Sequence, residues 1–207
     1  PLPLVNPELL AWLTDEAAVF PDTSRFASNC VRVPPRDQLE YARLVGKEVA
    51  CGKLRLAASA RGHGAVFAAD KANGKQRKIW HGAAVSAAAA KPPMPRRLAN
   101  AGSFVDIEAR RGTPLYFTKR DASTFFDVPR APPHLQQWFG QAPVSARALL
   151  DAGGIDRESL LTALEPTSQE GGFDLDAALT PIHTCWPMGF SWSSAVAQDV
   201  SLAVCER

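Results

Sequence analysis

The chain has 207 residues, a formal net charge of +2, 46% hydrophobic residues and 21% charged residues, the proportions of an ordinary globular protein. It contains no apolar run long enough to span a membrane, and its first residues lack the basic start and apolar stretch of a signal peptide. The four cysteines are widely spaced, so we expect no disulfide framework, no structural zinc site and an intracellular (cytoplasmic or nuclear) location. Because the sequence does not begin with methionine, we expect a fragment of a longer product.

Charge is distributed unevenly along the chain. Residues 71–120 contain eleven Lys or Arg residues and two acids, whereas residues 151–207 contain nine acids and two basic residues. A basic middle segment is typical of a face that binds a polyanion. It is equally consistent with a solvated surface of mixed charge.

The first 60 residues have a helical pattern. Pro7 begins one short helix, and a longer helix is predicted from Gln38 to about Ala50, with Asp37 as its N-cap. Apolar residues in the longer helix recur with helical spacing and so lie on one face.

A β-hairpin is the clearest local prediction. Residues 65–69 form an apolar strand, Asn73-Gly74 is a strong turn signal, and the polar residues that follow form the return strand. Side chains alternate along a strand, so Lys75 and Arg77 share one face and Lys78 lies on the other. Such a pair of cations suits a phosphate clamp, and it also suits an exposed edge hairpin that charge keeps soluble.

Three further helices are expected. An Ala-rich run over residues 83–90 predicts a short helix before an extended Pro-rich stretch. Another short helix is expected near residues 157–164, within an acidic and loosely packed connection over residues 151–179. A helix of small residues should follow Gly189 and extend to about Cys205.

Residues 115–118 predict a strand that leads into Asp121. A carboxylate at the end of a strand, followed by small residues and by the aromatic pair Phe125-Phe126, is a suitable layout for a Mg²⁺ site. Two such ions stabilise the attacking and leaving oxygens of an in-line phosphoryl displacement. The alternative is that Asp121 caps a helix and that the two phenylalanines belong to the core.

The second motif covers residues 184–198. A strand is stopped by Pro187, turns at Gly189 and continues as the helix of small residues. The segment around Ser191 lacks the second glycine of a serine-hydrolase nucleophile elbow, so acyl hydrolysis is not expected.

In their order and spacing, the basic hairpin, the strand ending at Asp121 and the Pro-Met-Gly-Phe-Ser segment resemble the reverse transcriptase domain of retroelements, particularly the divergent copies in protist genomes. The similarity covers roughly residues 60–207. It implies an α+β fold, namely a partial right-hand polymerase with an antiparallel palm sheet and a fingers hairpin. The expected regions are a helical N-terminal fingers region (1–60), the fingers hairpin with a basic connection (61–112) and a partial palm (113–207).

The resemblance also implies an activity, a site and partners. The activity is RNA-directed DNA polymerisation, in which a nucleotide from dNTP is transferred to a DNA primer paired with an RNA or DNA template. Asp121 would be the catalytic residue and would bind Mg²⁺. The implied substrate-binding residues are Lys75, Arg77, Lys78, Ala122, Phe126, Met188, Gly189 and Gln198. Among them, Phe126 would be the aromatic gate that discriminates against the ribose 2′-hydroxyl. The rest of a retroelement polyprotein is a further expected partner, and a membrane is not.

Departures from the family pattern lead us to expect weak metal binding and no polymerase activity. The sequence stops at Arg207, before the second pair of metal-binding aspartates, so Mg²⁺ should be held weakly and the fragment should be inactive. Where the family continues the fingers strand with Asp-x-Arg, this chain has His81-Gly82-Ala83, and its Ala-rich run suggests a decayed copy. The alternative function is a non-catalytic nucleic-acid-binding module derived from the same fold.

Overall fold

The structure is a computed structural model that describes residues 5–25, 38–72, 74–93, 105, 107–108, 111–116, 125–164 and 174–205. These residues form a mixture of helices and short antiparallel sheets, in agreement with the predicted α+β class. Within these ranges, no helix is both long and apolar enough to cross a membrane.

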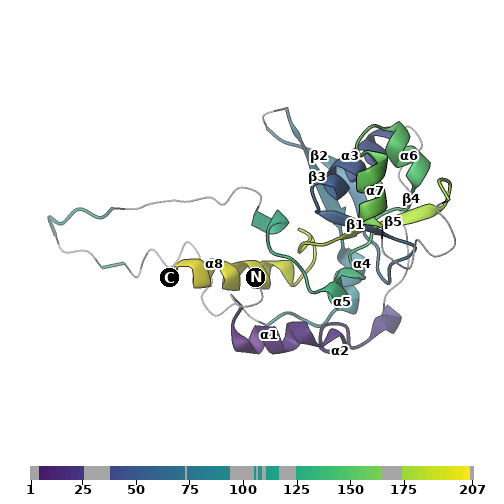
Figure 1. Cartoon of the computed structure of the whole chain (residues 1–207). Coiled ribbons are helices and arrows are strands. Elements are labelled where there is room, and N and C mark those ends of the chain that lie inside the picture. The colour runs from purple at the N-terminus through teal and green to yellow at the C-terminus, as the bar shows by residue number, and fades with distance from the viewer. Residues whose placement is uncertain are drawn as a thin grey trace.

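Helices and strands are interspersed along the chain (Figure 1). The α-helices are α1 (Pro7–Thr14), α2 (Glu16–Val19), α3 (Gln38–Ala50), α4 (Ala83–Ala88), α5 (Pro133–Gln136), α6 (Ala146–Asp151), α7 (Arg157–Ala163) and α8 (Ser193–Cys205). The strands are β1 (Leu54–Ala57), β2 (Ala65–Asp70), β3 (Gln76–His81), β4 (Val144–Ser145) and β5 (Ala178–His183). Two 3₁₀ turns are η2 (Thr23–Arg25) and η5 (Phe125–Asp127).

Most of the predicted helices are confirmed. Helix α1 begins at Pro7, and the side chain of Asn6 caps it by accepting a hydrogen bond from the Leu9 amide. Helix α3 has the predicted bounds, while α4, α7 and α8 match the remaining expectations within a few residues. The expected cap Asp37 lies outside the described residues.

A three-stranded antiparallel sheet has the order β1-β5-β4. Arg55 of β1 pairs with Ile182 of β5, and Val144 of β4 pairs with Leu179. The prediction that the first 60 residues are helical was wrong at β1, a strand of only four residues. The sheet therefore joins the end of the expected N-terminal region to the expected palm region.

The two strands expected for the palm have different outcomes. The strand expected to end at Pro187 instead runs over Ala178–His183, because its pairing with β1 and β4 is complete before Thr184. Leu115 and Tyr116, the first residues of the other expected strand, are exposed and belong to no strand. Residues 117–124 lie outside the described part of the chain.

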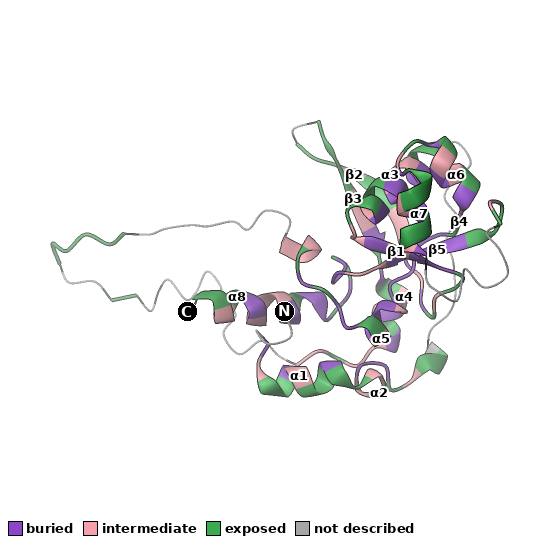
Figure 2. Ribbon diagram, viewed as in Figure 1, coloured by how far each residue is buried: buried purple, intermediate pink, exposed green. Residues whose placement is uncertain are grey.

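The predicted hairpin is confirmed as the antiparallel pair β2–β3, in register from Ala65 opposite His81 to Asp70 opposite Gln76. Gly74 has a φ of 72°, which favours glycine in the turn, and its neighbour Asn73 is not described. The hairpin projects from the body of the molecule, and its outer end is exposed (Figures 1 and 2). Its base is anchored by Trp80, which is only 3% exposed.

Buried apolar side chains form two clusters. The first cluster joins α1, α2, α4, α5 and α8 and contains Leu13, Phe139 and Trp192. The second cluster packs α3, α6 and α7 against the sheet and contains Leu56, Leu149 and Leu160. The burial of Leu160 shows that residues 151–164 are not the loosely packed connection that was expected, because α7 supplies core to α3.

Candidate functional site

A polar cavity of about 220 Å³ lies between the base of the β2–β3 hairpin, the η5 turn and the segment before α8. We call it the hairpin cavity. Its lining residues come from five separate stretches of the chain: Glu48, Lys53, Lys78, Trp80, Phe126, Asp127, His183, Cys185, Trp186, Pro187 and Met188.

Three of the predicted substrate-binding residues line this cavity together. Lys78 enters it from β3, Phe126 from η5, and Met188 from the rim formed by the Pro-Met-Gly turn. Lys78 is half-buried and lines the cavity together with Trp80, with which it was predicted to share a face of the strand. One residue from each of the three sequence motifs therefore lines the same cavity.

The other predicted residues lie elsewhere. Arg77 is on the opposite face of β3, where it lines a separate hollow at the outer part of the hairpin, and Lys75 is exposed. Gln198 is half-buried on α8, and its Oε1 has no hydrogen-bond partner among the described residues. Asp121 and Ala122 lie outside the described residues, so their places in the site stay predictions.

Gly189 holds its turn close to the hairpin. A Cβ atom at this position would lie 2.4 Å from the carbonyl oxygen of Trp80, and the φ of Gly189 is 116°. Ser86 of α4 supports the same turn, because its Oγ accepts a hydrogen bond from the Ser191 amide at 3.1 Å. The turn next to Met188 is thus fixed against both β3 and α4.

Two ion pairs that the sequence analysis missed flank the cavity. Lys78 Nζ donates to Glu48 Oε2, and Lys53 Nζ donates to Asp127 Oδ2 at 2.6 Å. The partners are 30 and 74 positions apart, so no local pattern could have paired them. Apart from Lys78, only Asp127 among these four residues could be linked to the site from the sequence, because it follows Phe126 directly.

The two lysines have different electrostatic environments. Burial lowers the pKa of Lys78, against the opposing attraction of Glu48. Burial acts in the same direction on Lys53, but the hydrogen bond and charge of Asp127 and the charge of Glu48 outweigh it and raise the pKa of Lys53. Lys53 is therefore a firmly protonated cation.

The imidazole of His183, which also lines the cavity, is uncharged. Its Nε2 lies 2.9 Å from Nε2 of Gln141, an amide nitrogen that can only donate, so the imidazole accepts there. Burial, and then the positive charges of Lys78 and Lys53, hold the pKa of His183 well below its ordinary value. With two lysines, two carboxylates and a neutral imidazole, these groups give no net charge.

A metal site is not evident in the part of the chain that the structure describes. No group of three or more His, Cys, Asp or Glu side chains there could hold an ion. Asp121 lies outside these described residues, so the expected Mg²⁺ site stays a prediction.

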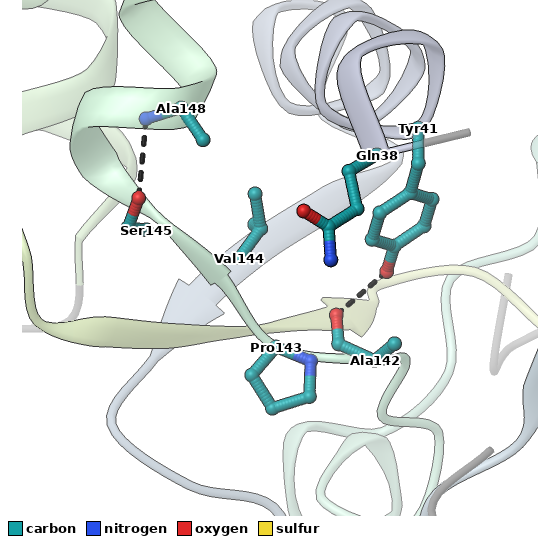
Figure 3. A pocket seen from close by; sticks show the side chains of 7 residues that line it. All are labelled: Gln38, Tyr41, Ala142, Pro143, Val144, Ser145 and Ala148. Carbon is teal, nitrogen blue, oxygen red and sulfur yellow. Dashed lines mark hydrogen bonds between the residues drawn. The ribbon is translucent and has the colours of Figure 1, made fainter. Parts of the chain in front are cut away.

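A second, larger cavity lies between α3 and β4 (Figure 3). It measures about 420 Å³ and is lined by no charged residue. The Tyr41 hydroxyl donates to the Ala142 carbonyl at 2.7 Å, and Ser145 Oγ accepts from the Ala148 amide at 3.2 Å. This cavity therefore offers mainly apolar surface, and its two hydroxyls already hydrogen-bond to the backbone, so the hairpin cavity with its charged groups is the better candidate.

Comparison of the chain with protein-family models, curated proteins and solved structures finds no match. A function must therefore be inferred from the residues of this chain.

Proposed function

We propose that the chain is the fingers and partial palm of a reverse transcriptase and that the hairpin cavity receives part of a nucleotide substrate. The observation that carries this proposal is the meeting of Lys78, Phe126 and Met188 in one cavity. They belong to three motifs whose order along the chain suggested the family.

The size and chemistry of the cavity support a sugar and base as its occupant. Its volume of about 220 Å³ is below the roughly 300–1,000 Å³ of pockets that enclose a whole drug-sized ligand, so it suits only part of a nucleotide. Trp80, Phe126 and Trp186 contribute aromatic edges to the lining, and the half-buried Phe126 is the most accessible of the three rings. Because Lys53 and Lys78 are already paired with carboxylates, the triphosphate needs other cations.

In the proposed reaction, a primer 3′-hydroxyl attacks the α-phosphorus of dNTP and pyrophosphate leaves. Mg²⁺, which the resemblance assigns to Asp121, would neutralise the developing charge. One carboxylate is too few for a pair of ions, because Mg²⁺ keeps its waters and needs several well-placed oxygens. We therefore propose that the 207-residue chain by itself does not extend a primer.

Nucleotide binding tests the proposal without requiring catalysis. Trp80 and Trp186 line the cavity, so titration with dATP should quench tryptophan fluorescence, and ATP should bind more weakly because its 2′-hydroxyl meets Phe126. Phe126→Ala should reduce the preference for dATP. Phe67→Ala, an exposed aromatic on the hairpin, is the matched control and should not. Absence of quenching, or an unchanged preference in Phe126→Ala, would refute the proposal.

The outer face of the hairpin favours the second candidate, a non-catalytic nucleic-acid-binding module. Arg77 and Lys71 line the hollow there, next to the half-buried Ile79, and Phe67 is 50% exposed. Cations beside exposed aromatic surface are typical of sequence-independent binding to nucleic acid.

Binding of a labelled RNA–DNA hybrid, followed by fluorescence anisotropy at several salt concentrations, tests this candidate. Affinity should fall steeply with salt, and Arg77→Gln should lower the log–log slope by roughly 0.7–0.9 because one phosphate contact is lost. Glu8→Gln, a charge change on α1, should not lower it. Hybrid binding without nucleotide binding would favour this candidate over a polymerase.

A further inference from the structure

Phe126 stands in a turn that is too short to fix its own geometry. The η5 turn has three residues, and its closing backbone bond runs from the Val128 amide to the Phe125 carbonyl at 3.1 Å. A single 3₁₀ turn is weakly stabilised by its own hydrogen bonds. The position of the Phe126 ring over the cavity must therefore depend on contacts from outside the turn.

Such contacts converge on Asp127, the residue next to Phe126. Lys53 Nζ donates to its carboxylate at 2.6 Å, and Cys185 Sγ donates to its backbone carbonyl at 3.0 Å. On the other side of Phe126, Phe125 packs against the first core cluster, with its ring at 90° to that of Phe126. Asp127 is thus held by both its side chain and its backbone.

Lys53 is itself well anchored. Its backbone carbonyl accepts hydrogen bonds from the Thr184 amide at 2.9 Å and from Thr184 Oγ1 at 3.0 Å, so it is fixed to the segment that ends in Cys185. Its side chain is 35% exposed and that of Asp127 is 39% exposed, so solvent screens the pair only in part. Lys53 therefore connects the end of β5 to the turn that carries Phe126.

We propose that Lys53 is a positioning residue for Phe126, acting through Asp127, and that it sets how strictly the hairpin cavity selects the sugar of its ligand. The inference rests on the proposed nucleotide site. Lys53 does not contact the sugar in this scheme. It determines where the aromatic ring stands, and the ring determines which sugar fits.

The test compares the affinities for dATP and ATP, measured by tryptophan quenching, in charge variants of the pair. Lys53→Met should lower the preference for dATP about fivefold, the scale of a lost, partly screened ion pair. Lys53→Arg should retain the preference, because it keeps the charge. The reversed pair Lys53→Glu with Asp127→Lys should restore most of it. Arg147→Ala, which breaks the exposed Arg147–Asp176 pair, is the matched control and should have no effect.

The possible outcomes distinguish a failure of the positioning role of Lys53 from a failure of the proposed nucleotide binding. Normal quenching with an unchanged preference in Lys53→Met overturns the inference alone. Equal weakening of both nucleotides also overturns it, because a merely structural contact would act in that way. If neither nucleotide quenches the unsubstituted protein, the proposed function fails and the inference fails with it. Should Lys53→Met not fold, Asp127→Asn carries the same expectation, because it leaves the backbone contact with Cys185 in place.

Discussion

Gly189 is the residue at which backbone geometry most directly shapes the cavity. We predict that Gly189→Ala lowers the free energy of unfolding by about 2–4 kcal/mol, because its Cβ would lie 2.4 Å from the Trp80 carbonyl oxygen and its φ is 116°. Gly153→Ala is the control, since Gly153 has a φ of 68° but no atom within 4 Å of an added Cβ. It should cost only about 1 kcal/mol of backbone strain. Urea unfolding measures both, and equal losses would contradict the role of the Trp80 contact.

His183 makes stability depend on pH. Its pKa is lowered well below the ordinary value in the folded protein, so on acidification the unfolded chain takes up the proton first. The contribution of His183 to the free energy of unfolding should be fully present above about pH 6.5. Below that pH the contribution should decrease by at most about 1.4 kcal/mol per pH unit. His63 contributes in the same direction, because burial lowers its pKa too.

Urea midpoints at pH 7, 6 and 5 measure this dependence. His183→Gln should flatten the slope between pH 7 and 5, whatever its effect on absolute stability. Phe67→Ala, which removes no titratable group, is the control and should leave the slope unchanged. An unaltered slope in His183→Gln would show that the acid sensitivity arises elsewhere.

Among the elements, the β2–β3 hairpin has one buried strand residue, Trp80. Trp80 is 3% exposed, and its Nε1 donates to the Gly140 carbonyl at 3.0 Å. We predict that Trp80→Ala costs about 3–5 kcal/mol of unfolding free energy, whereas Phe67→Ala, at a half-exposed position of the same hairpin, costs less than about 1 kcal/mol. Comparable losses in urea unfolding would mean that the hairpin is not anchored through its base.

The same hairpin shows what a sequence can and cannot predict. Its turn, register and alternation are local properties, and so is the apolar face of α3, so both elements could be predicted. Strands β1 and β4 are four and two residues long, and they exist because they pair with β5 from distant parts of the chain. The same distinction between local and long-range contacts applies to the residues of the hairpin cavity. Lys78, Phe126 and Met188 lie in recognisable motifs, but the Lys53–Asp127 pair joins residues 74 positions apart.

At the scale of the whole molecule, the chain contains a useful asymmetry between its two core clusters. All five tryptophans belong to the first cluster or pack against it: Trp80, Trp138, Trp186 and Trp192 are members, and the Trp12 ring lies 5.7 Å from that of Trp192, tilted by 50°. The second cluster contains none. Tryptophan fluorescence therefore reports unfolding of the first cluster, whereas far-UV circular dichroism reports helices in both.

The two clusters should unfold as one unit, because Val66 of the hairpin packs against both. Leu149 is fully buried in the second cluster, so Leu149→Ala should cost about 2–5 kcal/mol. With a urea dependence of about 1–3 kcal/mol per molar, the midpoint should fall by at least about 0.7 M. This shift should occur equally in fluorescence and in circular dichroism, although the substitution lies in the cluster without tryptophan.

Two controls make this measurement decisive. Leu13→Ala, at a fully buried position of the first cluster, should shift both signals by a similar amount, and Leu161→Ala, at an exposed position of α7, should shift neither by much. If Leu149→Ala moves the circular dichroism midpoint and leaves the fluorescence midpoint in place, the clusters unfold independently. The hairpin cavity draws Glu48 from α3, a helix of the second cluster, and Trp80 and Trp186 from the first. Independent unfolding of the second cluster would therefore open the cavity on its α3 side while the first cluster stays folded, whereas coupled unfolding keeps the cavity intact until the whole chain unfolds.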